Sequence, residues 1–159
     1  MSEYSAEQVG RALARIPSGC AILTARHEGR RSGMLASWIQ QAGFDPPAVS
    51  VAVKKGRPIE ELMDAAGSFA LNLIGDDPAP MFRHFGRGYG LDDDAFERLN
   101  VTDCDGGVAL VDAMAILNCR VAGKYDAGDH WIYVGHVTDA KARDEGRPYV
   151  HLRKNGMNY

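Results

Sequence analysis

The first region of the sequence that could do chemistry is suited to a flat, negatively charged ligand. In residues 33–38, small side chains would let a ligand approach the backbone closely. The following predicted strand ends in the basic run 53–57, where Lys54, Lys55 and Arg57 could hold a phosphate through charge-assisted hydrogen bonds. A solvated turn is the alternative interpretation of the basic run.

The second such region is residues 128–131, Gly-Asp-His-Trp, at the start of a predicted strand. His130 can donate or accept a proton near neutral pH, so it is a candidate for contact with a reactant. The alternative is a turn that leads into the strand, with His130 hydrogen-bonded to Asp129 or to water.

Motifs of several other catalytic classes are missing. The sequence has no Gly-x-x-x-x-Gly-Lys-Ser/Thr phosphate loop and no Gly-x-Ser-x-Gly nucleophile elbow, and residues 86–90 lack the spacing of a dinucleotide-binding fingerprint. The five histidines include no His-x-x-x-His pair. We therefore expect neither covalent hydrolysis nor a metal site.

Length and composition indicate an ordinary globular chain. Its 159 residues, 45% hydrophobic and 25% charged, fit one domain over 1–159. The formal charge of −3 gives no reason to expect nucleic acid as a partner, and no apolar run is long enough for a membrane span. The polar start is not that of a signal peptide, so we expect a cytoplasmic protein. Its three cysteines lack Cys-x-x-Cys spacing, which favours buried reduced thiols.

The pattern of apolar and turn residues predicts the elements that position these groups. A first helix should begin at a capping box of Ser5 and Gln8 and end before Pro17. We expect short strands at 20–26, 33–41, 48–53, 68–74, 113–121 and 130–140, a short helix at 58–63, and one or two more helices in the excursion 78–99.

The order of these elements predicts the fold class. The first two strands should form a hairpin, and the segment Asp45-Pro46-Pro47 should interrupt pairing, because proline has no backbone N–H to donate. Six short strands with few helices predict a mainly β fold, a β-barrel with peripheral helices, rather than a parallel α/β sheet.

Several short segments occur in a set order along most of the chain. They are Ile16-Pro17-Ser18-Gly19, Gly33-Met34-Leu35-Ala36-Ser37, Asp45-Pro46-Pro47, Phe69-Ala70-Leu71-Asn72-Leu73, and Gly128-Asp129-His130 with Gly135. Together they resemble the flavin reductase-like family, whose members fold as an FMN-binding split barrel and commonly dimerise. The chain is most similar to the flavin reductase-like domain at the C-terminal end of some flavodiiron proteins, in residues 34–38 and 129–131 and in the His-x-Arg-Lys-x-Gly pattern of 151–156.

The resemblance implies an NAD(P)H:flavin oxidoreductase. Such an enzyme transfers hydride from NADH or NADPH to bound FMN and passes electrons to free flavin or to a partner such as a monooxygenase. His130 would face the nicotinamide as the catalytic residue, and a homodimer is implied. The implied cofactor-binding residues are Met34, Leu35, Ala36, Ser37, Trp38, Val53, Lys54, Lys55, Arg57, Phe85 and Gly86.

Two of these residues depart from the reductases that serve monooxygenases. Leu35 stands where those often carry threonine, and bulky Trp38 stands where they carry a small residue. Trp38 would stack near the flavin or narrow the access of the nicotinamide. No diiron or flavodoxin portion is present in the sequence, so the oxygen-reducing chemistry of flavodiiron proteins is not carried over.

Alternatives to the reductase remain open. One is an FMN-binding electron carrier with little nicotinamide activity, and another is a haem-binding or purely structural split barrel. FAD could replace FMN if the mouth of the pocket is open.

Overall fold

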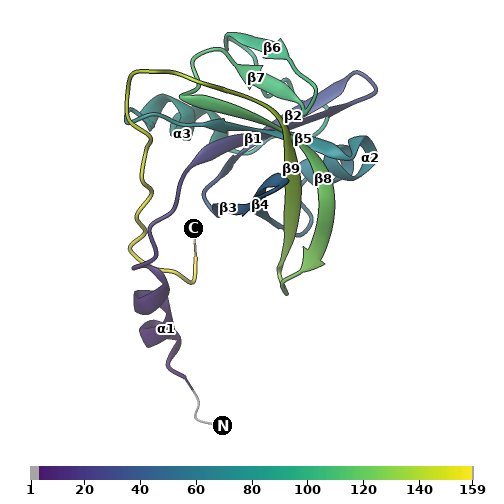
Figure 1. Cartoon of the computed structure of the whole chain (residues 1–159). Coiled ribbons are helices and arrows are strands. Elements are labelled where there is room, and N and C mark those ends of the chain that lie inside the picture. The colour runs from purple at the N-terminus through teal and green to yellow at the C-terminus, as the bar shows by residue number, and fades with distance from the viewer. Residues whose placement is uncertain (1–3, 159) are drawn as a thin grey trace.

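The computed structural model describes residues 4–158, and its main body is built from antiparallel strands (Figure 1). The strands are β1 (Ala21–His27), β2 (Arg30–Ala36), β3 (Ile39–Phe44), β4 (Pro47–Lys54), β5 (Ser68–Leu73), β6 (Val101–Asp103), β7 (Val108–Leu110), β8 (Ala115–Asp126) and β9 (His130–Ala142). Seven of them form one sheet in the order β2-β1-β5-β8-β9-β4-β3, while β6 and β7 form a separate small sheet. The helices are α1 (Ala6–Leu13), α2 (Ile59–Ala66) and α3 (Ala79–Phe85).

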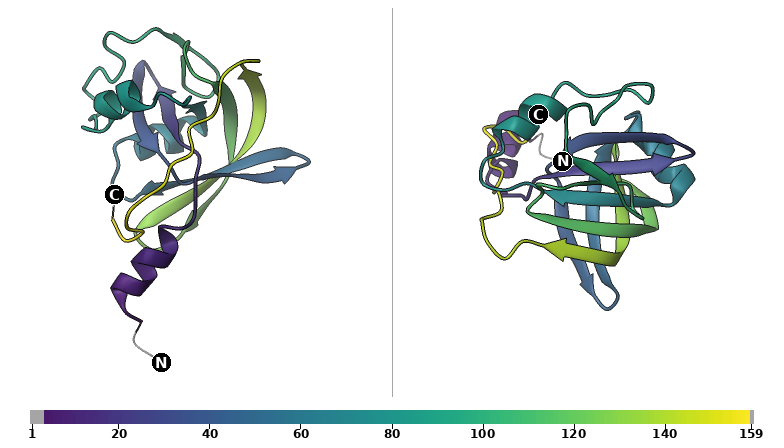
Figure 2. Two further views of the ribbon diagram at one scale, coloured as in Figure 1. Left: turned by 90° about the vertical axis from the view of Figure 1, so that its left-hand side faces the viewer. Right: turned by 90° about the horizontal axis from the view of Figure 1, so that it is seen from above.

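The sheet curls because its two edge strands are consecutive in the chain. β2 and β3 lie at opposite ends of the strand order, yet only Ser37 and Trp38 connect them. Two residues span roughly 7 Å when fully extended, so the two edges must come together at this corner. The result is a barrel that stays open between β2 and β3, seen from above in Figure 2.

The core lies inside this barrel. Alternate residues of the strands point inward, as the two-residue period of a strand requires, and Leu23, Val51, Phe69 and Tyr133 are fully buried there. Helix α2 covers one end and adds Leu62 and other apolar side chains to the same cluster.

A buried polar network attaches the small sheet to the barrel. The Asn72 side chain donates to the carbonyl oxygens of Ile22 (3.2 Å) and Val108 (3.0 Å) and accepts from the Leu110 N–H (2.8 Å). The Thr24 hydroxyl donates to the Val108 oxygen (2.7 Å) and accepts from its N–H (3.0 Å). These side chains replace the backbone partners that a third strand would otherwise supply.

The C-terminal segment after β9 runs back along the molecule to α1 (Figures 1 and 2). Three backbone contacts fasten it: Tyr149 N–H to the Ile74 oxygen (2.9 Å), a reciprocal pair between Ser18 and His151, and Gly156 N–H to the Gly10 oxygen (2.9 Å). A side chain at Gly156 would collide with Leu13, so this close approach to α1 requires glycine. We call residues 147–158 the strap.

The mainly β barrel and the β1–β2 hairpin are confirmed, and the first helix ends before Pro17 as predicted. The single strand expected at 33–41 is wrong, because the corner at Ser37 and Trp38 divides it into β2 and β3. The capping box is also wrong in its chemistry, since the Ser5 side chain makes no capping hydrogen bond.

Two further expectations about strands need correction. Asp45 and Pro46 do not merely interrupt pairing, since they form the turn of the β3–β4 hairpin, in which Phe44 is opposite Pro47. The six expected strands omitted the short β6 and β7.

The cysteines behave as small core residues. Cys20 and Cys119 are buried, and burial raises the pKa of each thiol to about 12. Cys104 is half-buried, and its pKa is also raised by burial. All three are free thiols, which agrees with the reduced state predicted from their spacing.

Asn72→Ala tests the polar network. The substitution leaves the buried Leu110 N–H and Val108 oxygen without this partner, so we expect a loss of about 2–4 kcal/mol in the free energy of unfolding. Urea denaturation measures it. Asn100→Ala, at an exposed asparagine, is the control and should change stability by less than about 0.5 kcal/mol. Equal losses in the two variants would contradict the role given to Asn72.

Candidate functional site

A cavity of about 620 Å³ lies beside the corner that joins β2 to β3. Segments far apart in the sequence contribute to it: the end of β2, the corner, β4 and the residues after it, α3, and the strap. The lining residues are Met34, Leu35, Ser37, Trp38, Ala52, Arg57, Phe82, Phe85, Gly86, Gly88, His151, Leu152, Arg153, Lys154, Asn155 and Asn158.

One part of the lining is apolar and aromatic. Met34 and Leu35 come from β2, whose outer edge pairs with no other strand within residues 4–158. Phe82 and Phe85 come from α3. Gly86 ends that helix close to the Phe82 oxygen, where an added Cβ would lie 2.5 Å away. Flat apolar surfaces next to an unpaired strand edge can hold a planar ring and hydrogen-bond it through the backbone.

Another part of the lining is cationic and comes from two directions. Arg57 is exposed and follows β4, whereas Arg153 is half-buried and comes from the strap. The Arg153 guanidinium carbon lies 4.9 Å from the centre of the Trp38 ring, a cation–π contact. The Trp38 backbone oxygen accepts from the Ala52 N–H (3.0 Å), which fixes the corner against β4.

Two buried polar atoms of the strap lack hydrogen-bond partners among the described residues. They are Nη1 of Arg153 and Nδ1 of His151. The His151 ring is held edge-on by Phe82, with ring centres 5.9 Å apart. Burial, followed by the nearby Arg153 charge, lowers the pKa of His151 below 6.5. An unpaired buried donor costs about 1–3 kcal/mol, so these atoms mark a place where a polar ligand would be stabilised.

The structure brings together seven of the residues predicted to bind the cofactor. Met34, Leu35, Ser37, Trp38, Arg57, Phe85 and Gly86 all line the cavity. The side chains of Ala36 and Val53 instead point into the core and are 3% and 0% exposed. These two residues could therefore contact a ligand only through their backbone groups.

The two lysines of the predicted phosphate cluster do not line the cavity. Lys55 forms an ion pair with Asp126 (2.7 Å) and lies over the Trp131 ring at 4.3 Å. Lys54 is exposed and stands opposite His130 in the β4–β9 pairing. Of the three cations in the run, the structure places Arg57 at the cavity.

His130 lies behind the corner rather than in the cavity lining. It is 5% exposed, its Nδ1 is 2.8 Å from Oδ1 of Asp129, and its ring centre is 4.7 Å from that of Trp38. The contact with His130 lowers the pKa of the Asp129 carboxyl. Trp38 thus connects His130 to the cavity.

The residues that the strap adds to the cavity have no role in the sequence-based prediction of the site. The pattern at 151–156 contributes to the resemblance, but nothing in its local spacing says that it returns to the β2–β3 corner. Long-range backbone contacts, among them the bridge between Ser18 and His151, bring it there.

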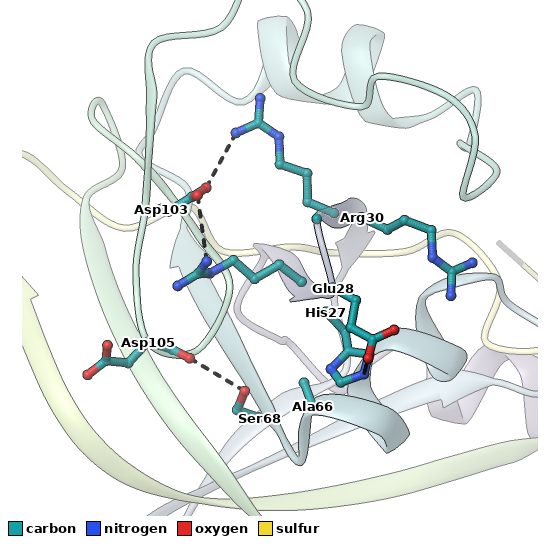
Figure 3. Close-up of a pocket in the computed structure, with 10 residues that line it drawn as sticks. His27, Glu28, Arg30, Ala66, Ser68, Asp103 and Asp105 are labelled. Carbon is teal, nitrogen blue, oxygen red and sulfur yellow. Dashed lines mark hydrogen bonds and ion pairs between the residues drawn. The ribbon is translucent and has the colours of Figure 1, made fainter.

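A second hollow, at the β1–β2 hairpin, is rich in charge but balanced (Figure 3). Asp103 is 3.6 Å from Arg26 and 3.4 Å from Arg31, and Arg30 pairs with Glu61 at 2.6 Å. These ion pairs connect the hairpin to its neighbours, and the Asp103 carboxylate is shared between Arg26 and Arg31.

Comparisons with known proteins agree on one family. Residues 13–158 match the family described as the flavin reductase like domain. The chain is 38% identical over 152 residues to diflavin flavoprotein A 1 of Synechocystis sp., covering 94% of this chain and 26% of that protein. It is 33% identical over 160 residues to putative diflavin flavoprotein A 5 of Nostoc sp., covering 99% and 28%. The chain therefore spans about a quarter of the length of these relatives.

Solved structures show the same fold. The NADH:FAD oxidoreductase SgcE6 of Streptomyces globisporus C-1027 superposes with a TM-score of 0.83 at 23% identity, over 89% of this chain and 86% of that one. The styrene monooxygenase flavin reductase of Pseudomonas putida S12 gives 0.75 at 27% identity, over 89% and 90%.

The strap makes a prediction about protonation. Arg153→Gln should raise the pKa of His151, because a neighbouring positive charge is removed, and NMR titration of the ring would show it. In the wild type the pKa of His151 is lower in the folded protein than in the unfolded chain. The free energy of unfolding should therefore decrease as the pH falls through 6.5, and it should decrease less in His151→Gln. Exposed Arg147→Gln is the control. A His151 pKa at or above 6.5 in the wild type would contradict this account.

Proposed function

The chain belongs to the family of the flavin reductase like domain, and from that premise we propose that it is an NAD(P)H:flavin oxidoreductase with FMN as its bound flavin. The observation that supports the proposal most strongly is the cavity at the β2–β3 corner, which combines aromatic walls, a strand edge that is unpaired within residues 4–158, and a buried Arg153 donor with no partner among those residues. A flavin has the matching parts: a planar ring, polar ring edges and a phosphate.

When bound, FMN would supply an acceptor for the hydride of NADH or NADPH. The chain's own contribution is to bind and to orient. Backbone groups of Met34 to Trp38 hold the ring, Phe82 and Phe85 exclude water from its surroundings, and exposed Arg57 holds the phosphate. Holding two reactants in contact is itself a large catalytic effect, so no acid–base side chain is needed for hydride transfer.

His130 is the residue that we propose for the nicotinamide side. Its ring contacts Trp38, and its link to Asp129 fixes the orientation of the imidazole. Through this contact Trp38 controls how closely the nicotinamide approaches the cavity, and His130 sets the position of Trp38.

An electron carrier is the second candidate. It is favoured by the relatives named diflavin flavoproteins, in which a domain like this one makes up only about a quarter of the protein. The reductase is favoured by the 27% identical styrene monooxygenase flavin reductase, whose name also suggests a monooxygenase as the acceptor. FAD in place of FMN is supported by the NADH:FAD oxidoreductase among the structural neighbours.

We further propose that residues 1–159 form a single domain that works in the cytoplasm as a homodimer. Helix α1 projects from the barrel (Figure 1), and Ile16 and Leu152 beside it are 59% and 67% exposed. Exposed apolar side chains close to a projecting element are suited to contact with a second copy. Within residues 4–158, no helix is long and apolar enough to cross a membrane.

Anaerobic reduction tests the function. Addition of NADH or NADPH to FMN-loaded protein should rapidly bleach the flavin band at ~450 nm. Slow bleaching, no faster than for free FMN, would favour the electron carrier. Failure to bind FMN, FAD or riboflavin would reject both flavin functions.

His130→Ala separates the roles within the same assay. We expect slower reduction by the nicotinamide, or a higher KM for it, while FMN affinity changes little. If the variant instead loses FMN and melts early, His130 is a structural residue. Unchanged reduction and unchanged FMN binding would return it to the turn interpretation.

Light scattering at micromolar concentration tests the oligomeric state. The FMN-loaded protein should have about twice the 17.3 kDa mass of one chain, because the exposed apolar residues around α1 would be covered in a dimer. Ile16→Glu should shift the mass toward one chain. A single-chain mass for the wild type with FMN still bound would reject the dimer.

A further inference from the structure

We propose that Arg153 and His151 of the strap bind the polar edge of the flavin ring, and that Arg57 holds the phosphate. The inference rests on the proposed function, since it assigns parts of the same flavin to different residues. It makes the strap a ring-recognition element rather than a passive C-terminal tail.

One hydrogen-bond donor of Arg153, the Nη1 group, lacks an acceptor among residues 4–158. Its guanidinium is held against Trp38 at 4.9 Å, and its Nη1 is buried with no hydrogen-bond partner among residues 4–158. A stacked guanidinium keeps its N–H groups in the plane of the fork, where they can meet a carbonyl oxygen. The same cavity wall contains Ser37 and Trp38, the end of the backbone segment that we assign to the ring.

His151 supplies the second group. Its Nδ1 is also buried and unpartnered within the described chain. The ring packs against Phe82 and Tyr149, whose ring centres are each 5.9 Å from that of His151. The pyrimidine edge of a flavin alternates carbonyl acceptors with an N–H donor. A guanidinium beside an imidazole matches that alternation, since imidazole nitrogen can accept as well as donate.

The strap is fixed well enough to position these groups. The reciprocal backbone hydrogen bonds between His151 and Ser18 are 2.7 and 3.1 Å long. Further along the strap, the Gly156 N–H donates to the backbone oxygen of Gly10 in α1. Arg153 lies between these two anchors. Its position is therefore set by the backbone and does not depend on side-chain packing alone.

Burial divides the two arginines between the two parts of the flavin. A phosphate is strongly hydrated, and removing it from water costs much free energy. An exposed arginine such as Arg57 can bind the phosphate while it stays partly in water. A neutral ring carbonyl costs less free energy to remove from water than a charged phosphate does, so it fits a half-buried donor such as Arg153.

The experiment compares FMN with riboflavin, which has the same ring and no phosphate. Dissociation constants are measured by flavin fluorescence for the wild type and for Arg153→Gln, Arg57→Gln and Arg147→Gln. We expect Arg153→Gln to weaken both ligands by about ten-fold or more, and Arg57→Gln to weaken FMN alone. Arg147→Gln, at an exposed arginine of the same strap outside the cavity, should change neither.

Two further variants guard against a loss of structure. His151→Phe keeps an aromatic ring between Phe82 and Tyr149 but removes the nitrogen, and it should also weaken both ligands. Arg153→Lys keeps the charge but lacks the planar fork, so it should restore only part of the affinity. Thermal melting of each variant without flavin shows whether it is folded.

Each remaining outcome overturns the assignment. Loss of FMN binding with normal riboflavin binding in Arg153→Gln would make Arg153 a phosphate ligand, and unchanged binding of both by a folded Arg153→Gln would remove it from the site. A wild type that binds neither flavin would instead reject the proposed function itself.

Discussion

The two-residue connection between β2 and β3 is the constraint on which the rest of the structure depends. A seven-stranded antiparallel sheet has two edges with unpaired backbone groups, and here Ser37 and Trp38 tie those edges together without pairing them. The sheet must curl to bring its ends within reach, which creates an enclosed core. The same corner leaves a strand edge open, and in proteins such an edge has to be covered or used.

The covering at this corner comes from the strap and from α3. The strap follows β9 back across the cavity and is fastened to Ile74, to Ser18 and finally to α1. The corner itself is fixed by the Ala52 hydrogen bond to Trp38 and by the packing of Trp38 between His130 and Arg153. Trp38 therefore lies between the two residues at the corner to which we assign roles in binding or catalysis, His130 on one side and Arg153 on the other.

Local patterns were enough to predict the barrel, but not the surroundings of the cavity. Strand alternation depends on neighbours in sequence, and the predicted β1–β2 hairpin follows from it. The corner was missed because residues 33–41 are uniformly compatible with a strand, and the break is imposed by closure of the sheet. The three cations of the basic run 53–57 do not all line the cavity, for a similar reason. Lys55 finds Asp126, which is 71 residues away, and no local pattern carries that information. The small β6–β7 sheet depends on Asn72 and Thr24, whose side chains act at a similar range.

The unpartnered strap atoms connect stability with ligand binding. Burying Nη1 of Arg153 and Nδ1 of His151 without partners costs free energy in the protein alone, about 1–3 kcal/mol for each such group. Anything that accepts or donates at these atoms removes that cost only when the strap is in place, so binding and strap closure favour each other. The reciprocity is thermodynamic: whatever the strap adds to ligand affinity, the ligand adds to the stability of the strap. Because the strap is also bonded to Gly10, this coupling extends from the cavity to α1, the element that projects farthest from the barrel.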